Sequence, residues 1–262
     1  MQIGKPGPAV TSIAQACSDR VEVRGRDLSE LMGKLSFTAY FHLLLTGSEP
    51  SEEQLFFLDV LLLSIAEHGM MPTSVVSRMT LAADPDSLQG AVAAGLLGAG
   101  PVILGAAAAC ARLLEQAQAS VAAGREPAAV AGELVQGIRA EGGKVPGFGH
   151  PLHRPLDPRA ERILELADVR RVSGPHVALA RELRPAVAEA WAKPLPMNVA
   201  MPIAAVMLDL GYPARTVQAV PILARTAGIL AHLAEEQERP IGFLLAGAAE
   251  GSVRYEPPAE DP

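Results

Sequence analysis

The segment Lys144–Arg159 gathers residue types that could bind an anionic ligand and act on it. It holds Gly147, Gly149 and His150 among several prolines and two arginines. Glycine lets a backbone approach a ligand closely and present its N–H groups, and histidine donates a proton or a hydrogen bond near neutral pH. Arginine offers forked donors that match carboxylate or phosphate. A stiff surface loop between two helices is the alternative, and spacing alone does not decide between them.

The residues around this segment predict the helices that must position it. Asp157-Pro158 reads as an N-cap and a first-turn proline opening a helix over Arg159–Ala167. Hydrophobic residues make up 49 % of the chain and aromatics only 4 %, so alanine, leucine and valine must fill the core and favour helix. In Leu28–Leu45, for example, the apolar residues recur at helical spacing. No segment shows the alternation of apolar and polar residues that is typical of a strand. We therefore expect an all-α fold of about a dozen or more helices.

Composition excludes several classes of function. The net charge of −7 argues against nonspecific nucleic-acid binding. Cys17 and Cys110 lack a CxxC partner, so we expect neither a disulfide framework nor a metal site. The start of the chain lacks the pattern of a signal peptide, which leads us to expect a cytoplasmic protein.

The uncharged stretch 87–111 is long enough to span a membrane, but glycines and a proline interrupt it. Helices buried in the protein or at a subunit interface fit better, and we expect no membrane contact. A soluble chain would cover so apolar a surface. We therefore predict a homodimer with helices around Ser87–Ala123 at its interface.

A second histidine, His68, stands in Glu67-His-Gly69 at the end of a predicted helix. A histidine followed by a glycine cap is favourable at a helix C-terminus, where it meets the helix dipole. Spacing alone therefore favours a structural role for His68 over a role in ligand binding.

The sequence Pro146-Gly-Phe-Gly-His150, followed by Asp157-Pro-Arg159, resembles the active-site histidine loop of the citrate synthase family. That family includes the citryl-CoA lyases and the lyase domain of ATP-citrate lyase. The resemblance extends over nearly the whole chain. It implies a large helical domain formed by residues 1–106 and 212–262, with a smaller helical domain, 107–211, inserted. The ligand would bind in the cleft between them, and the domains would close on it.

The resemblance also implies roles for particular residues. His150 and His68 would be catalytic, His68 by contacting the carboxylate substrate. Three arginines would bind substrate carboxylates, with the last supplied across the dimer interface: Arg159, Arg225 and Arg239. A coenzyme A thioester would be the second substrate, with no metal required. The backbone that approaches it would be that of Val145, Pro146, Gly147, Phe148 and Gly149.

Two positions depart from the family pattern. Ile103 stands where the synthases have a histidine that bonds the thioester carbonyl, and isoleucine can make no hydrogen bond. Ala200 stands where the family has the aspartate that removes or returns the proton on the acetyl carbon. Asp209 lies nine residues further on and is not expected to reach the same place. The lyase domain of ATP-citrate lyase is also apolar where Ile103 stands, which favours a lyase.

Three functions are therefore open. The first is citryl-CoA lyase-like cleavage of a 3-hydroxy-acyl-CoA to acetyl-CoA and a keto acid, or the reverse. The second is citrate-synthase-like condensation. The third is a catalytically impaired paralogue that binds carboxylate and coenzyme A without chemistry.

Overall fold

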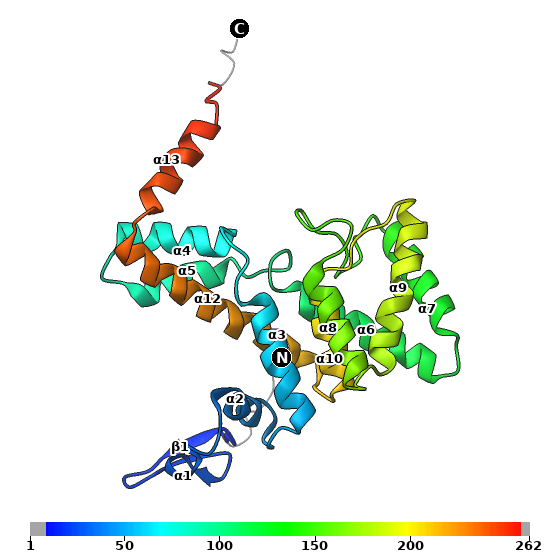
Figure 1. The fold of residues 1–262 in the computed structure, drawn as a ribbon, viewed down its shortest axis with the longest axis horizontal. Coiled ribbons are helices and arrows are strands. Elements are labelled where there is room, and N and C mark those ends of the chain that lie inside the picture. Colours follow the sequence, from blue (N-terminus) through cyan, green and yellow to red (C-terminus); the bar gives the residue numbers. More distant parts are fainter. Residues whose placement is uncertain (1–8, 258–262) are drawn as a thin grey trace. The chain divides into compact units, whose positions relative to one another are not determined.

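A computed structural model describes residues 9–257, and most of them are helical (Figure 1). This confirms the all-α prediction apart from one small sheet. The strands are β1 (Ala14–Ala16), β2 (Val21–Val23) and β3 (Arg26–Asp27). The helices are α1 (Leu28–Leu31), α2 (Phe37–Thr46), α3 (Glu52–Ala66), α4 (Pro72–Ala83), α5 (Leu88–Leu97), α6 (Ala106–Ala122), α7 (Pro127–Ala140), α8 (Pro158–Val169), α9 (Pro175–Trp191), α10 (Ala200–Asp209), α11 (Ala214–Val217), α12 (Ala219–Glu238) and α13 (Gly242–Ser252).

The sheet is antiparallel in the order β1-β2-β3. Its second turn consists of Arg24 and Gly25, whose φ angles of 52° and 76° are both positive. Two positive φ angles are typical of the tight hairpin turns that match strand twist. Each strand has two or three residues, too few for the alternation that would predict a strand from sequence.

The helix predicted over Leu28–Leu45 is two helices, which corrects the prediction. Asp27 caps α1 by accepting a hydrogen bond from the Ser29 N–H, and the chain then passes through Gly33 with φ of 80°. Ser36 caps the new helix α2 by accepting from the Ala39 N–H. A positive φ cannot continue a right-handed helix, so the apolar spacing runs across a break.

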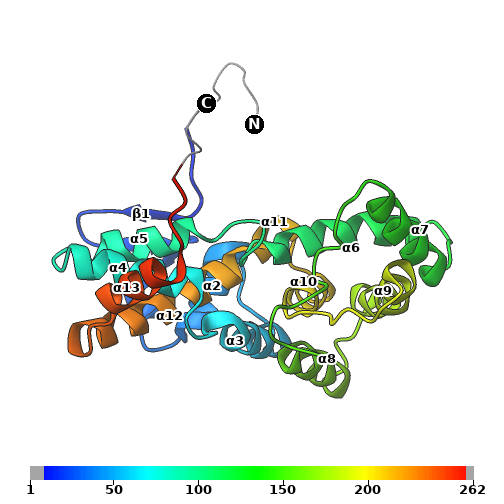
Figure 2. The same cartoon turned by 90° about the horizontal axis from the view of Figure 1, so that it is seen from above.

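Contacts divide the chain into a unit up to Asp59 and a unit from Val60 onward. In the second unit, α4, α5, α12 and α13 pack together, and α6 to α10 form another group (Figure 2). The first group has a core of Leu81, Ala91, Ile229 and Leu233. The predicted division into residues 1–106 with 212–262 and residues 107–211 stays a prediction.

A buried ion pair fixes α4 against α12. Arg78 is fully buried, and its Nη1 donates to Glu236 Oε2 over 2.8 Å. Glu235 accepts from the same guanidinium, and Glu236 Oε1 also accepts the N–H groups of Ile241 and Gly242 at the start of α13. A buried charge needs such partners, so this cluster ties three helices together.

The helix that begins at Ala200 is buried on all sides. Every residue from Ala200 to Leu208 is buried, and α10 contacts α6, α8 and α9. A helix that is apolar all around is expected at the centre of a helical group. Its first residue therefore has a fixed position, which matters for the site below.

The stretch 87–111 forms α5, a turn and the start of α6, so its glycines interrupt it as predicted. Among the described residues, the run long and apolar enough to cross a membrane is Ala214–Glu238. It carries Arg225 and Glu236, both buried and hydrogen-bonded inside the protein. These charged contacts favour a helix of the protein core.

Candidate active site

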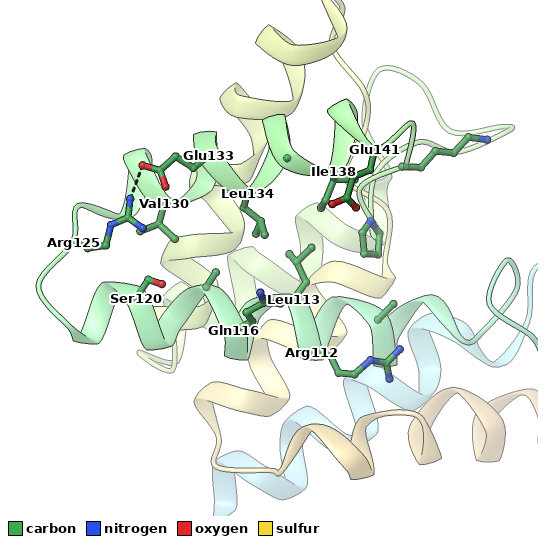
Figure 3. Close-up of a pocket in the computed structure, with 15 residues that line it drawn as sticks. Arg112, Leu113, Gln116, Ser120, Arg125, Val130, Glu133, Leu134, Ile138 and Glu141 are labelled. Carbon is green, nitrogen blue, oxygen red and sulfur yellow. Dashed lines mark hydrogen bonds and ion pairs between the residues drawn. The ribbon is translucent and has the colours of Figure 1, made fainter.

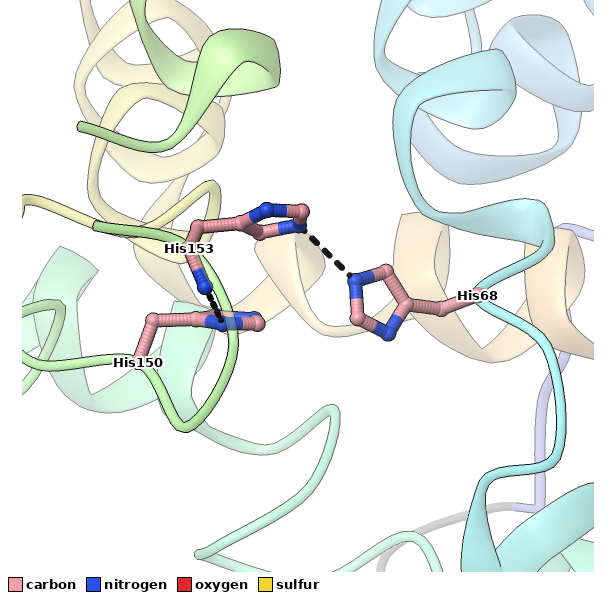
Figure 4. Close-up of side chains that lie close together, drawn as sticks. All are labelled: His68, His150 and His153. Carbon is pink, nitrogen blue, oxygen red and sulfur yellow. Dashed lines mark hydrogen bonds between the residues drawn. The ribbon is translucent and has the colours of Figure 1, made fainter. Parts of the chain in front are cut away.

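Three histidines from two separate segments meet in one cluster (Figure 4). His68 lies between α3 and α4, and the loop before α8 supplies His150 and His153. The His68 and His153 Nε2 atoms are 3.0 Å apart, and the rings of His150 and His153 stack with centroids 4.3 Å apart. The His68 and His150 ring centroids are 5.3 Å apart. The structure thus brings the two predicted catalytic histidines together.

Backbone hydrogen bonds fix the proton on the His150 ring. Its Nδ1 accepts from the N–H groups of Leu152, at 3.1 Å, and His153, at 3.0 Å. An imidazole nitrogen that accepts carries no proton, so the neutral ring holds its proton on Nε2. Burial is the main cause that lowers the pKa of His150, followed by the charge of His153. His150 is therefore a neutral hydrogen-bond donor at neutral pH.

The loop before His150 is held by the segment before α10. The Gly147 carbonyl accepts from the Asn198 N–H at 2.8 Å, and the Gly149 N–H donates to the Pro196 carbonyl at 2.8 Å. Asn198 Nδ2 also donates to the Gly149 carbonyl. Sequence reasoning expected the loop to present its N–H groups to a ligand, but that of Gly149 is used inside the protein. The Phe148 N–H likewise donates to the Val145 carbonyl.

Glycine is required at position 147. Its φ is 80°, and a Cβ there would lie 2.8 Å from Cys110 Sγ and 2.8 Å from Met201 Cβ. Both the backbone conformation and the lack of space exclude a side chain. The loop is therefore pressed onto α6 and α10.

Arg159 is held by the residue that caps its own helix. Asp157 is the N-cap of α8, as predicted, and accepts from the Arg159 N–H. The same carboxylate accepts from Arg159 Nε at 3.0 Å and Nη2 at 2.8 Å, and also from the Val199 N–H. These bonds hold the pKa of Asp157 below its ordinary value although burial, the largest effect, acts to raise it. Asp157 thus orients the arginine and ties α8 to the start of α10.

Arg225 is a buried cation with unused donors. It is 3 % exposed, and its Nη2 donates to the Ile65 carbonyl at 3.2 Å. Its Nε and Nη1 have no hydrogen-bond partner among the described residues. Burial is the main cause that lowers its pKa, although Glu67 acts in the opposite direction. Unpaired donors on a buried charge are costly, and an anion that reached this guanidinium would offset that cost.

These side chains surround one cavity of about 330 Å³. Its polar lining side chains are His68, His150, Arg159, Asn198 and Arg225. Ile103 and Ala200 line it as well, so both departures from the family pattern face this cavity. No aspartate or glutamate is among its described lining residues. The cavity has the charge to bind carboxylates but no carboxylate base.

A larger cavity of about 740 Å³ adjoins it and shares Gly149, His150 and Asn198 with it. All five residues predicted to approach coenzyme A, Val145–Gly149, line this larger cavity. Lys144, Lys193 and Trp191 line it too, and the Arg139 guanidinium lies 5.2 Å from the centre of the Trp191 ring. Cations and an aromatic ring suit a ligand with phosphates and a purine.

A third cavity, of about 690 Å³, lies between α6 and α7. Figure 3 shows side chains of both helices reaching into it, with an ion pair between Arg125 and Glu133 near one end. It shares Ala109, Lys144 and Pro146 with the 740 Å³ cavity. Open space therefore continues from the loop before His150 along the groove between α6 and α7.

Some expected residues lie elsewhere, and one was missed. Arg239 is exposed at the end of α12 and lines none of these three cavities. Asp209 accepts the N–H groups of Gly174, His176 and Val177 at the start of α9. Sequence reasoning gave no role to His153, although its position three residues after His150 was the available signal.

The three imidazoles lie close enough together to test the expectation that the protein needs no metal. Their ring nitrogens lie within 4.8 Å of one another, a spacing that a metal ion could bridge. The proton fixed on His150 Nε2 and the nearby cations Arg159 and Arg225 oppose a metal at this position. The expected absence of a metal stays a prediction.

The sequence is similar to known proteins. It matches the family profile "Citrate synthase, C-terminal domain" over residues 9–242. The chain belongs to the citrate synthase family. It is 32 % identical over 212 residues to "Putative citrate synthase 2" of Mycobacterium tuberculosis and of Mycobacterium bovis. That match covers 77 % of this chain and 52 % of the relative, so the chain spans about half the length of these curated relatives.

Solved structures of the same family extend the likeness. Citryl-CoA lyase from Hydrogenobacter thermophilus matches 98 % of both chains, with 28 % identity and a TM-score of 0.83. An aspartate-to-alanine mutant of ATP citrate lyase from Methanosaeta concilii, in complex with (3S)-citryl-CoA, matches 98 % of this chain and 43 % of its own. Its identity is 21 % and its TM-score 0.77, so it shows the shared fold.

Proposed function

We propose that this protein cleaves a 3-hydroxy-acyl-CoA of the citryl-CoA type into acetyl-CoA and a keto acid, or runs the reverse. The observation that carries the proposal is the buried Arg225 with two unused donors, in a cavity joined to one that suits coenzyme A. The full-length likeness to citryl-CoA lyase supports it.

The residues of the smaller cavity would bind the acid part of the substrate. Arg225 and Arg159 would hold its carboxylates, since charge-assisted bonds from arginine to carboxylate are strong and directional. The fixed Nε2–H of His150 would donate to the oxygen on the carbon that becomes the keto group. A donor aimed at that oxygen stabilises the alkoxide that forms there before the carbon–carbon bond breaks, and it polarises the keto carbonyl in the reverse reaction.

The residues of the larger cavity would bind the thioester part. The wall formed by Val145–Gly149 would lie along coenzyme A, with Lys144 and Lys193 near its phosphates. Trp191 would offer a flat surface to the adenine. His150 lines both cavities, so the acid and the thioester would meet beside it.

The second candidate function is binding of carboxylate and coenzyme A without turnover. It is favoured by the absence of any carboxylate among the described residues of the 330 Å³ cavity. Condensation requires removal of a proton from the acetyl carbon, and a missing general base typically costs about 10²–10⁴-fold in rate. A protein that binds carboxylate and coenzyme A without turnover would also have this cavity. Asp209 and Glu67 do not line this cavity, so neither carboxylate is placed to act as the missing base.

The two functions are separated by measuring turnover and binding on the same protein. Oxaloacetate released from (3S)-citryl-CoA is followed by its reduction with malate dehydrogenase and NADH. Release that depends on Arg225 supports a lyase, whereas calorimetric binding of citrate and coenzyme A without release supports a binding protein. Failure to bind either compound would refute both.

We also propose a cytoplasmic homodimer in which Arg239 completes the partner's site. Leu97, Val102 and Phe243 are 87 %, 91 % and 73 % exposed, an apolar surface of the kind that subunit contacts cover. Sedimentation of the wild type and of Leu97→Asp, which lies in the predicted interface, at micromolar concentration tests this. We expect a dimer that the substitution weakens, and a monomeric wild type would contradict the proposal.

A further inference from the structure

His68 and His153 form a pair of imidazole rings in contact through their Nε2 atoms. Their Nε2 atoms lie 3.0 Å apart, within hydrogen-bond distance. Two neutral imidazoles can make this contact only if one Nε2 carries a proton and the other does not. When both rings are neutral, they therefore hold opposite tautomers, with one Nε2 proton between them. His68 lines the 330 Å³ cavity, whereas His153, in the loop before α8, is not among its lining residues.

The charges around the pair come from every segment that faces it. Arg159 and Asp157 stand at the start of α8, Arg225 on α12, and His150 in the same loop as His153. Glu67 precedes His68 and accepts the N–H groups of His68 and Gly69. Burial is the main cause that lowers the pKa of His68, and the charge of Arg159 comes next. His68 is therefore neutral at neutral pH when no anion occupies the cavity.

A carboxylate in the cavity would reverse this balance. It would pair with Arg225 and Arg159, and their combined positive field at His68 would weaken. An added negative charge within a few ångströms also favours an imidazolium directly. The pKa of His68 would rise, and the protein would take up a proton at a pH between the old and new values.

We infer that His68 and His153 act as one proton-holding pair, which is loaded when a carboxylate ligand enters the arginine-lined cavity. This rests on the proposed function and supplies what its cavity lacks. His68 would be the catalytic member because it lines the cavity, and His153 would be a positioning residue that acts through His68.

The proton taken up by the His68–His153 pair would supply the proton that the cleavage step needs. When the bond between the carbinol carbon and the thioester α-carbon breaks, its electron pair passes to the α-carbon and its thioester. The carbinol oxygen becomes a keto oxygen, and its proton leaves to water. The α-carbon takes the proton held by His68 and becomes the methyl carbon of acetyl-CoA. No oxidant, metal or further reactant is needed.

Calorimetry measures the uptake directly. Malate is the probe because both of its carboxyl groups are ionised at pH 7, so any proton that moves belongs to the protein. Its binding enthalpy is measured near pH 7 in buffers of different ionisation enthalpy, and the slope gives the protons taken up. We expect a clear uptake, at most about one proton per site. His153→Gln should reduce it to less than about half while malate still binds.

The matched control is His176→Asn. His176 lies outside the cavity and contacts Asp209, so this variant should take up as many protons as the wild type. Equal uptake in the wild type and His153→Gln would overturn the inference. So would tight binding of Zn²⁺ that His153→Gln abolishes, because the cluster would then be a metal site.

A second measurement needs no ligand. Nitrogen NMR of ¹⁵N-histidine protein, assigned with His68→Gln and His153→Gln, reports the tautomer of each ring. Opposite tautomers for His68 and His153 support the pair, and identical tautomers overturn it. If malate fails to bind, the tautomers still decide on the pair, and oxaloacetate release from citryl-CoA tests the proposed function separately.

Discussion

Replacing Arg225 by methionine should weaken ligand binding without destabilising the protein. The side chain is 3 % exposed, and its Nε and Nη1 are the donors that lack a partner among the described residues. A hydrogen bond to a charged group contributes about 1.5–3 kcal/mol. Two such bonds to a carboxylate would together contribute about 3–6 kcal/mol. We therefore expect the affinity for citrate to fall at least about 100-fold.

The effect on stability should be small because two terms oppose each other. Methionine removes a buried charge that has unused donors, which is favourable. It also removes the bond from Nη2 to the Ile65 carbonyl, which is unfavourable. The free energy of unfolding without ligand should change by less than about 2 kcal/mol in either direction.

The assay pairs calorimetry with citrate and urea unfolding without it. Arg181→Met is the matched control, because Arg181 is partly exposed and pairs with Asp168 away from the cavity. It should leave citrate affinity unchanged. If Arg225→Met binds citrate like the wild type but unfolds more easily by several kcal/mol, Arg225 is a structural residue and the reasoning is wrong.

Three further predictions test other parts of the site and fold. Ala200→Asp, and more so Ile103→His with Ala200→Asp, should raise the rate of citrate formation from acetyl-CoA and oxaloacetate by up to about 10²–10⁴-fold; a flat series in a free-CoA assay would mean that these positions do not have the expected roles. Trp191→Ala should weaken coenzyme A binding by about 1–3 kcal/mol and leave citrate affinity unchanged, as measured by calorimetry; equal loss for both ligands would contradict the role of the ring. Glu236→Gln should lower the free energy of unfolding by about 1.5–3 kcal/mol in urea, because it removes the buried one of the two carboxylates that pair with Arg78, and a change under about 1 kcal/mol would show that Glu235 alone is enough to pair with Arg78.

Much of the fold and part of the site could be predicted because their signals are local. Asp157-Pro158 combines an N-cap side chain with a first-turn proline ahead of helical spacing, so the start of α8 could be predicted. The loop before His150 was identified by its glycines and proline in a fixed order. The helix break at Gly33 was not predicted, because apolar residues continue at helical spacing on both sides of it. Helical periodicity does not report a single residue with positive φ.

The rest of the site depends on long-range contacts that a sequence does not display. His153 gains its role from His68, which is 85 residues away in the chain. The unused donors of Arg225 depend on which groups α12 brings near, and residue type alone cannot show that. The same limit holds for Asp209, whose bonds to the start of α9 come from packing. Arg239 and its role in a partner's site stay a prediction.

The close packing at Gly147 means that the larger cavity could be reshaped from behind. Cys110 and Met201 press on this glycine, yet neither lines the cavity. A smaller residue at 201 would let the wall sink towards α10, and a larger one would push it outward. An engineer could therefore change the shape of the wall proposed to lie along coenzyme A without changing any residue that lines the cavity.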